Sequence, residues 1–249
     1  MTGDIVYQSV LNAIRKDKRG LSLSLDEYNF YSRIVDKKVI IAFMSRWEDD
    51  IEITSHAGFL KVPDYPITLV QGIGVLPSNY FRIMGDPTYV DADGNTTHID
   101  VITSKERTYR ERDYLTKATL KNPTCVIGGQ DSLQKMQIRV YPASITSILI
   151  DYVRDTVSPF LDYYINDTTL QTTYLTKGQT LTLPFGCTYR DGTQSGTITS
   201  TTQDWEWDLH ELPWIVSYFL QELGVTLPDE LLIQVGKAES AELQNKKVW

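Results

Sequence analysis

Histidine and cysteine are the first residues to inspect for chemistry, because imidazole and thiolate groups act as metal ligands, proton carriers and nucleophiles. The chain of 249 residues has only His56, His98, His210, Cys125 and Cys187. The histidines have no second ligand at the spacing of a zinc site, and neither cysteine has a histidine near it in sequence. The sequence therefore predicts no metal residues and no activated nucleophile, and it leaves the roles of the two cysteines open.

Motifs that bind ions or phosphates are also missing. Asp91-Ala92-Asp93-Gly94-Asn95 begins like a calcium loop, but Thr96 and Ile102 stand where glycine and glutamate are required. Gly72-Ile73-Gly74 lacks the third glycine of a dinucleotide fingerprint, and the chain has no phosphate loop and no Gly-x-Ser-x-Gly elbow. We therefore predict no catalytic residues, no cofactor and no enzymatic activity. A hydrolase that brings together carboxylates from separate elements stays as an alternative, because a sequence cannot show such convergence.

The composition is rich in tyrosine and acidic overall. The chain has 15 Tyr, 5 Trp and 7 Phe, and its 24 basic and 32 acidic residues give a formal net charge of −8. The whole excess follows residue 150, where 6 basic residues face 14 acidic ones. An acidic half argues against a phosphate-binding surface there, because affinity for DNA comes largely from Lys and Arg. Aromatic side chains are enriched at protein interfaces, so the tyrosines are interpreted as interface residues.

One basic stretch is a candidate for contact with nucleic acid. It is interleaved with acidic residues and comprises Lys105, Glu106, Arg107, Arg110, Glu111, Arg112 and Asp113. The acidic residues cancel much of the positive field, so we predict a solvated, ion-paired helix face rather than a DNA site.

Neither a membrane span nor an export signal is visible. The longest apolar run, Val39 to Met44, is far shorter than the ~20 residues that cross a bilayer. The first ten residues lack the basic-then-apolar order of a signal peptide. We therefore expect no membrane partner and synthesis in the cytoplasm, with Cys125 and Cys187 as reduced thiols rather than a disulfide.

Helices are predicted at both ends of the chain. An amphipathic helix over residues 5–14 stops at Gly20, and a capping box from Ser24 to Glu27 opens a second helix that runs to Trp47. Near the other end, a helix beginning at His210 or Glu211 closes at Gly224. A final helix is predicted from Pro228.

Strands are predicted between these ends, because the apolar period changes from 3.6 towards 2 and prolines exclude long helices. The predicted strands are 67–70, 80–84, 88–90, 98–101, 124–127, 136–141 and 147–153, with a last β region at 174–202. Hairpin turns are predicted at 91–95 and 190–193. A capping box at Thr103 to Glu106 opens one short helix near 104–115.

Together these elements predict an α+β fold. Helices at both chain ends with strands between them suggest a helical domain, residues 1–60 plus 203–249, formed by the N- and C-terminal helices. An antiparallel β-rich domain, residues 61–202, would be inserted into it.

The order of several short segments resembles a known pattern of virion proteins. The segments are Gly20-Leu21-Ser22, Leu25-Asp26-Glu27-Tyr28-Asn29, Leu76-Pro77-Ser78-Asn79-Tyr80, Val101-Ile102-Thr103-Ser104, Ile138-Arg139-Val140-Tyr141-Pro142, Ile148-Leu149-Ile150-Asp151-Tyr152-Val153, and Asp204-Trp205-Glu206-Trp207-Asp208 to Leu223-Gly224-Val225-Thr226-Leu227. In this order they resemble the head-to-tail connector, or ring, proteins of crAss-like phages, which are tailed phages of Bacteroidetes.

The resemblance implies a structural virion protein and no catalytic residues. It implies a subunit of a ring, with twelve copies expected, that docks at the portal vertex against the portal protein and further tail ring proteins. DNA would pass through its channel during ejection without sequence-specific binding, and the protein would be made in the cytoplasm of the host bacterium. The place in the tail stack, the copy number and the domain that faces the lumen stay open, as does a contact made by the tail ending in Trp249.

The residues agree with this class of function. An acidic half suits a channel wall along which DNA slides without sticking, because like charges repel. An alternative is a virion accessory protein that binds a carbohydrate or receptor through exposed Tyr and Trp side chains of the β-rich middle.

Overall fold

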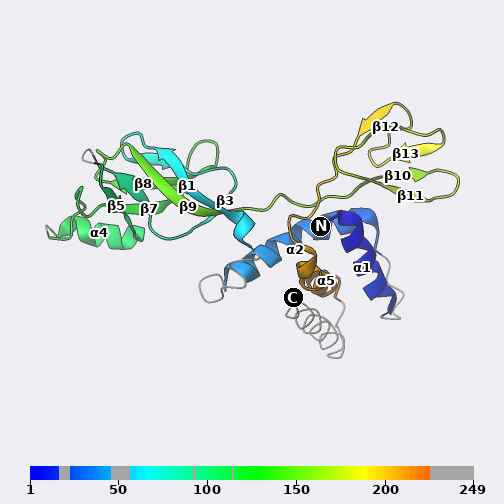
Figure 1. Ribbon diagram of the computed structural model, residues 1–249, viewed down its shortest axis with the longest axis horizontal. Coiled ribbons are helices and arrows are strands. Elements are labelled where there is room, and N and C mark those ends of the chain that lie inside the picture. The colour runs from blue at the N-terminus through cyan, green and yellow to red at the C-terminus, as the bar shows by residue number, and fades with distance from the viewer. Residues whose placement is uncertain (17–22, 46–56, 92–93, 114, 225–249) are drawn as a thin grey trace, which may run out of the picture. The chain divides into compact units, whose positions relative to one another are not determined.

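The computed structural model describes residues 1–16, 23–45, 57–91, 94–113 and 115–224. The chain divides into two compact units, here called unit 1 (residues 1–56 and 156–249) and unit 2 (residues 57–155). Among the described residues there are four α-helices and fourteen strands, and the strand pairs are antiparallel with a single exception (Figure 1). The fold is therefore mixed α+β, as predicted.

Unit 1 contains three of the helices. They are α1 (Gly3–Lys16), α2 (Leu25–Met44) and α5 (Leu212–Glu222), and α5 follows a 3₁₀ turn at Leu209–Glu211. The predicted capping box is confirmed, because Ser24 Oγ accepts a bond from the Glu27 amide (3.2 Å) and the Glu27 carboxylate accepts one from the Ser24 amide (2.9 Å). The chain leaves α5 at Gly224, whose φ of +69° suits glycine. The segment beyond residue 45 predicted to continue α2, and the helix from Pro228, lie outside the described residues.

Helix α5 packs against both α1 and α2. Apolar residues spaced three to four positions apart on α5 explain this packing, since Ile215, Phe219 and Leu220 are all buried. Phe219 stacks on Tyr28 of α2 with 5.2 Å between ring centroids. Residues almost two hundred positions apart thus form one helical core.

The strands of unit 1 form two small sheets. They are β10 (Asp162–Asn166), β11 (Thr172–Leu175), β12 (Thr180–Thr182), β13 (Cys187–Tyr189) and β14 (Thr197–Thr199). The strand order is β11-β10-β13 in one sheet and β12-β14 in the other. Their core is formed by Leu175, Leu183, Cys187, Tyr189 and Ile198.

The predicted hairpin at 190–193 is wrong, although a turn is present there. The Tyr189 amide donates to the Thr193 carbonyl, and Gly192 has a φ of +92°. The flanking strands do not pair with each other, because β13 pairs with β10 and β14 pairs with β12. The Asp-Gly sequence produces a local turn of the chain. The strands on either side of it pair with segments more than ten residues away.

Unit 2 is a pair of sheets. The strands are β1 (Lys61–Thr68), β2 (Ile73–Val75), β3 (Tyr80–Ile83), β4 (Thr88–Val90), β5 (Thr96–His98), β6 (Asp100–Val101), β7 (Thr124–Gln130), β8 (Met136–Tyr141) and β9 (Ser147–Arg154), after a 3₁₀ turn at Gly58–Leu60. One sheet has the order β1-β9-β4-β5, with β3 also paired to β9, and the other has the order β2-β8-β7-β6. The hairpin predicted at 91–95 is confirmed by the antiparallel pairing of β4 with β5.

A single apolar core joins the two sheets of unit 2. It includes Ile67 and Ile148 from one sheet and Cys125 and Ile138 from the other. Gly74 allows the close approach, because a Cβ atom there would lie 2.5 Å from Ile67 Cγ2 and 2.7 Å from Leu69 Cδ2.

Strand β1 is longer than predicted. It begins at Lys61 and contains Pro63 and Pro66, whereas the sequence predicted a strand only at 67–70. It lies at the edge of its sheet, and its register with β9 shifts between Val62 and Tyr65. Edge positions and bulges tolerate proline, because no ladder hydrogen bond from its nitrogen is needed.

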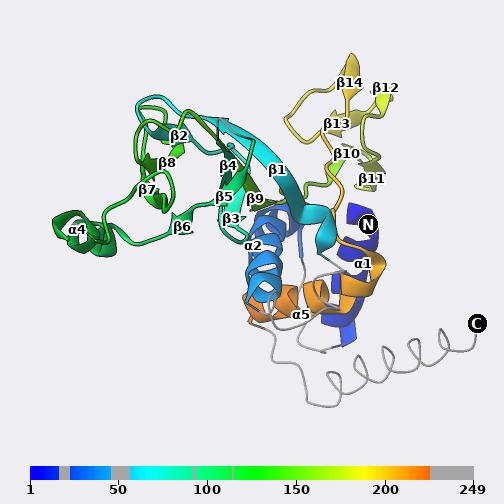
Figure 2. The same cartoon turned by 60° about the vertical axis from the view of Figure 1, so that its left-hand side comes forward.

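Strands β6 and β7 are the exception to the antiparallel rule. They pair in parallel and are joined through α4 (Ser104–Arg112). Thr103 caps α4 by accepting a bond from the Glu106 amide (3.2 Å). The helix ends before the predicted residue 115, because Asp113 is already extended. Figures 1 and 2 both show α4 at the periphery of unit 2.

The contacts divide the chain at a different place from the predicted domain ranges. Residues 156–202, assigned from the sequence to the β-rich domain, belong with the helices in unit 1. Side chains also join this segment to α2: Asn29 bonds both backbone groups of Leu161, at 2.8 and 3.0 Å. The hydroxyl of Tyr163 also donates to Asp26 (3.0 Å). The sequence gives no signal for such long-range partners.

Candidate functional site

The described histidines and the two cysteines are divided between the two units. His98 lies exposed at the end of β5 in unit 2, and His210 lies exposed in unit 1, while His56 is outside the described residues. Cys125 and Cys187 are buried and unbonded in different units. Burial raises the pKa of the Cys125 thiol to about 12, so at neutral pH it is no nucleophile. Within the ranges that the structure describes, no group of three His, Cys, Asp or Glu residues is arranged to hold a metal ion.

One cleft in unit 2 bears on the hydrolase alternative. It has a volume of about 400 Å³, and Asp64, Asp86 and Asp151 from three separate segments line it together with His98. The Asp151 carboxylate is already engaged, because it accepts a bond from the Asp64 amide (2.9 Å) and lies 3.2 Å from the Lys61 ammonium. The hydrogen bond from the Asp64 amide, assisted by Lys61, lowers the pKa of Asp151.

This arrangement supports the β1 bulge. Asp64 has a φ of +49°, and its amide is satisfied by Asp151 in place of a ladder partner. A carboxyl group with a lowered pKa is ionised at neutral pH and has no proton to donate as a general acid. The hydrogen bond and ion pair of Asp151 therefore argue against a general-acid role for this residue.

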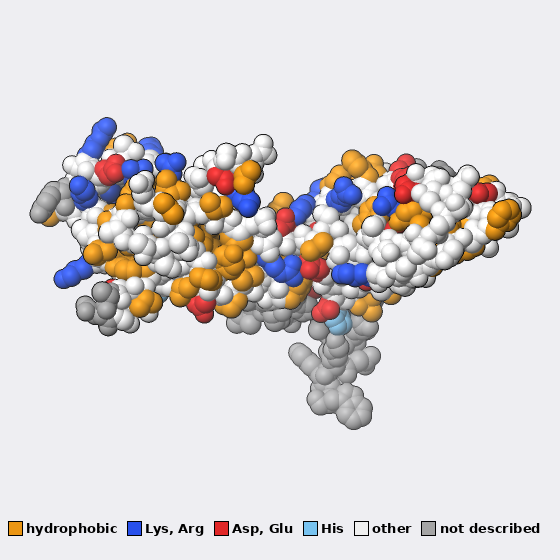
Figure 3. Space-filling view, turned by 90° about the horizontal axis from the view of Figure 1, so that it is seen from above, with side chains coloured by type: hydrophobic (Ala, Val, Ile, Leu, Met, Phe, Trp, Pro, Cys, Tyr) orange, Lys and Arg blue, Asp and Glu red, His pale blue; other side chains and the backbone are white. Residues whose placement is uncertain are grey.

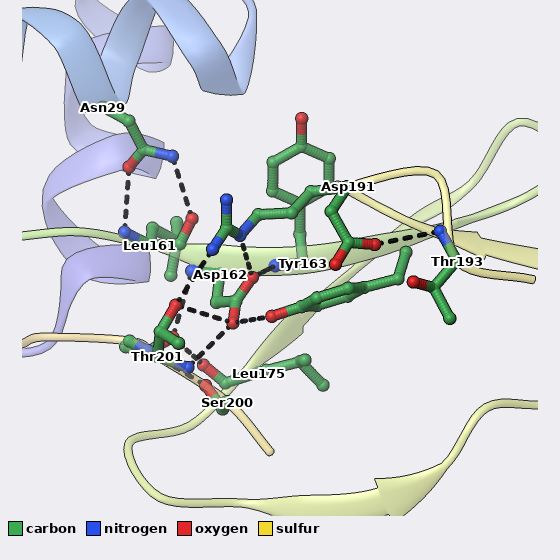
Figure 4. A network of polar contacts seen from close by, with 12 residues as sticks. Asn29, Leu161, Asp162, Tyr163, Leu175, Asp191, Thr193, Ser200 and Thr201 are labelled. Atoms are coloured by element: carbon green, nitrogen blue, oxygen red, sulfur yellow. Dashed lines mark hydrogen bonds and ion pairs between the residues drawn. The ribbon is translucent and has the colours of Figure 1, made fainter. Parts of the chain in front are cut away.

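The most connected polar group of unit 1 is Asp162, at the start of β10 (Figure 4). Its side chain is fully buried, with 0% exposure. One carboxylate oxygen accepts bonds from Arg190 Nε (2.8 Å) and the Tyr163 amide (3.0 Å). The other accepts bonds from the Tyr189 hydroxyl and from the amide (2.8 Å) and hydroxyl (3.1 Å) of Thr201.

With five donors, this carboxylate has no free acceptor position for a substrate. The guanidinium of Arg190 lies 4.7 Å from the Phe160 ring centroid, which holds the cation from a second side. Tyr163 is also locked in place, and burial together with its bond to Asp26 raises the pKa of its hydroxyl to about 12. The network joins β10 to the 190 turn and to residue 201, so its role is structural.

Many aromatic residues build the interior and are not available as the interface residues that the sequence suggested: 10 of the 24 in the described ranges are buried and 8 are half-buried. Of the tyrosines in the described ranges, only Tyr65 and Tyr109 are largely exposed. Trp205 and Trp207 are fully buried, and their indole N–H groups donate to the Tyr28 hydroxyl (3.1 Å) and the Asp36 carboxylate (2.9 Å). A hydroxyl or indole N–H lets a large ring satisfy buried polar groups while it fills the core.

Two apolar side chains are nevertheless displayed in unit 1, at one end of the β11-β10-β13 sheet. Leu170 lies in the β10–β11 turn and is 76% exposed, and Phe185 precedes β13 and is fully exposed. A backbone bond from the Asp167 amide to the Gly186 carbonyl (2.9 Å) joins the two turns. We call Leu170 and Phe185 the apolar tip. Hydrophobic side chains are visible at this end of the sheet in Figure 3.

The turns that carry the apolar tip are ordered. Asn166 Oδ1 accepts bonds from the amides of Thr168 (3.0 Å) and Thr169 (2.9 Å), and the Cys187 amide closes the other turn on the Pro184 carbonyl (3.2 Å). The Pro-x-Gly sequence around Phe185 is a turn signal that can be recognised in the sequence. The position of Leu170 beside it depends on the pairing of β10 with β13, which no local pattern shows.

Charge is distributed unequally between the units. Unit 1 has 13 basic and 21 acidic residues, and unit 2 has 11 of each, so the entire net charge of −8 belongs to unit 1. On α4 the predicted ion pairs are confirmed, with 2.7 Å between Glu106 and Arg110 and 2.8 Å between Arg107 and Glu111.

Comparison with known proteins does not identify the chain. No protein-family model matches it, and none of the curated proteins matches it significantly. No helix in the described ranges is long and apolar enough to span a bilayer.

Proposed function

We propose that the protein is a structural virion subunit of a head-to-tail connector ring, of twelve copies, that docks at the portal vertex and surrounds the DNA channel. In this proposal the terminal helices form the helical domain of the subunit, and the β-rich part is inserted into it. The partners are the portal protein and further tail ring proteins, and the protein reaches the virion tail after synthesis in the host cytoplasm. The sequence resemblance to connector proteins of crAss-like phages supplies the class, and the surface of unit 1 supports an assembly role.

The observation that carries the proposal is the apolar tip. Burying a side chain of the size of Phe or Leu stabilises a protein by about 1.5–3 kcal/mol, and the single chain does not gain this for Phe185. Two ordered turns hold the tip outward, so the cost of ordering the backbone of these turns is already met before a partner binds. Rigid apolar anchors of this kind are typical of the central contacts of protein interfaces.

The charge of unit 1 fits a channel wall. Its net charge of −8 repels the phosphates of DNA, which would slide past without releasing counterions and without sequence-specific contact. Acidic residues of unit 1 facing away from the lumen in an assembled ring would contradict this part of the proposal.

The alternative of a carbohydrate- or receptor-binding accessory protein has weaker support. Sugar sites use exposed aromatic rings, but Trp205 and Trp207 are buried. Trp214, 40% exposed, is the most accessible tryptophan in the described ranges. A hit in a glycan-binding screen, together with a protein that forms no rings, would favour this alternative.

Particle imaging of virions and of the purified protein tests the proposal. We expect twelve-fold rings at the portal vertex and, at sufficient concentration, in solution. The F185S variant should need about tenfold more protein for half-assembly, from a loss of roughly 1.4 kcal/mol per contact. L209S, which removes another exposed apolar side chain of unit 1, is the matched control. A wild-type protein that stays monomeric under all conditions and is absent from virions would overturn the proposal.

A further inference from the structure

The described part of the connection between β6 and β7, residues 103–113 and 115–122, contains no buried residue. We call residues 103–122 the crossover arm; it contains α4 and the turns that follow it. Among its described residues, which exclude residue 114, every side chain is exposed or half-buried. Helix α4 has no buried residue along its whole length. An amphipathic crossover helix normally packs its apolar face on the sheet that it connects, and α4 does not.

Topology alone explains the length of the arm but not its exposure. Parallel strands need a crossover of a dozen or more residues, so some connection is required between β6 and β7. The contacts of α4 with the rest of unit 2 are polar or cationic: Arg107 lies 4.1 Å from the Tyr141 ring centroid, and Arg110 pairs with Asp100 at 3.1 Å. A helix of nine residues is marginal in isolation. Within the described residues of unit 2, the arm is thus an ordered element that no other element covers.

The arm is held in one conformation despite its exposure. The Thr103 cap and the two ion pairs within α4 stabilise the helix. Asp113 accepts backbone bonds from Thr116 (3.2 Å) and Lys117 (3.0 Å), which form the following turn. The Leu120 carbonyl accepts a bond from the Tyr89 hydroxyl, which anchors the far end of the arm to the core. A surface held in this way is already organised for binding.

The arm combines positive charge with exposed apolar groups. Its six basic and three acidic residues give it a charge of +3 within a unit that is neutral as a whole. Four of the basic side chains have no ion-pair partner in the described part of the chain: Lys105, Arg112, Lys117 and Lys121. Three large side chains are exposed beside them: Tyr109 (61%), Leu115 (88%) and Leu120 (54%). Figure 3 shows Lys and Arg gathered at the end of unit 2 that carries α4.

We propose that the crossover arm docks on unit 1 of a second copy of this chain. The argument is charge complementarity, since unit 1 has all of the net charge of −8 and the arm is the ordered surface of opposite sign with apolar groups to bury. Such a contact uses different surfaces on the two copies and is therefore head-to-tail, the kind of interface that closes rings. This inference rests on the proposed ring function and assigns one of its interfaces.

Nucleic acid is the less favourable occupant of the arm. Arg107 and Arg110 are already neutralised by Glu111, Glu106 and Asp100, which would be repelled by phosphates. Leu115 and Leu120 offer nothing to a phosphate backbone but gain from burial against protein. The experiment below therefore also measures binding to duplex DNA.

The test compares two full-length variants with the same change of charge. K117E/K121E reverses two lysines of the arm, and K135E/R139E reverses two exposed basic residues of unit 2 outside it, so both variants have a net charge of −12. Self-association is measured by sedimentation velocity at low and high salt. We expect the arm variant to need about tenfold more protein for half-association and to lose most of its salt dependence. The control should differ from wild type by less than about threefold.

Mixing the arm variant with wild type tests the head-to-tail geometry. A variant subunit still offers unit 1 to the arm of a wild-type neighbour but cannot dock its own arm, so it ends a growing assembly. We expect substoichiometric amounts of the arm variant to replace rings by short open oligomers, whereas K135E/R139E enters rings normally. Circular dichroism should show both variants folded, because their substituted side chains are exposed.

The outcomes separate this inference from the proposed function. Twelve-fold rings formed equally well by the arm variant would overturn the inference and leave the ring function standing. A wild-type chain that never associates would overturn both. Unchanged association with a loss of duplex DNA binding in K117E/K121E alone would overturn docking on a second copy in favour of nucleic acid.

Discussion

Removing the Asp162 carboxylate should strongly destabilise unit 1. In D162A, Arg190, the Tyr189 hydroxyl and the two donors of Thr201 all lose their acceptor at a site with 0% exposure. Breaking a buried ion pair from one side costs about 3–5 kcal/mol. The Arg190 side chain is 33% exposed, so water partly solvates the orphaned guanidinium and the loss belongs at the lower end, about 3 kcal/mol.

Tryptophan fluorescence measures the loss of stability in unit 1, which contains Asp162. All five tryptophans belong to unit 1 and none to unit 2, so urea unfolding followed by this signal reports unit 1 alone. The variant D167A is the matched control, because the exposed Asp167 side chain in the neighbouring turn has no bond to lose. We expect the control to lie within about 0.5 kcal/mol of wild type.

The substitution D162N separates charge from shape. Asparagine keeps the volume and one acceptor oxygen but places an NH₂ donor against other donors, so we expect it to lose about 2 kcal/mol or more. If D162A and D162N both unfold within about 0.5 kcal/mol of wild type, the network does not hold unit 1 together and the reasoning is refuted.

Three further outcomes can be measured. The Cys125 thiol should resist alkylation at pH 8 in the native protein, as peptide mass spectrometry would show. Folding raises the pKa of this thiol from 9.0 to about 12. Unit 2 should therefore lose stability as the pH rises from 9 to about 12. S24A removes the α2 cap and should lower the stability of unit 1 by about 1 kcal/mol in urea, with an unchanged value contradicting the capping role. G74A forces a methyl group against Ile67 and Leu69 and should cost unit 2 about 1–3 kcal/mol by calorimetry, whereas G58A, whose added methyl meets nothing, should not.

The elements that sequence predicted well have their causes within a few residues. The Ser24 capping box, the ion pairs of α4 and the 91–95 hairpin each depend on side chains three to five positions apart. Strand β10 was missed, and residues 156–202 were assigned to another domain, because their partners Asn29 and Asp26 lie more than a hundred residues away.

Catalytic motifs can be searched for in the sequence, whereas interface surfaces can be found only in the folded chain. The lack of ligand spacing among the histidines is visible in the sequence, and His98 and His210 belong to different units. The apolar tip and the crossover arm are not visible there. A leucine in a sequence gives no sign of whether it will be buried like Leu175 or exposed like Leu170.

By itself, the sequence determined the helix boundaries set by caps and glycine, the mixed α+β class, the acidic balance and the residue types available for chemistry. Tertiary structure alone decided which strands pair, where the chain divides into units, and which aromatic side chains form the interior. The physical reason is that local hydrogen bonds and charge are properties of neighbouring residues, whereas burial and strand pairing are settled among segments that compete for the same core.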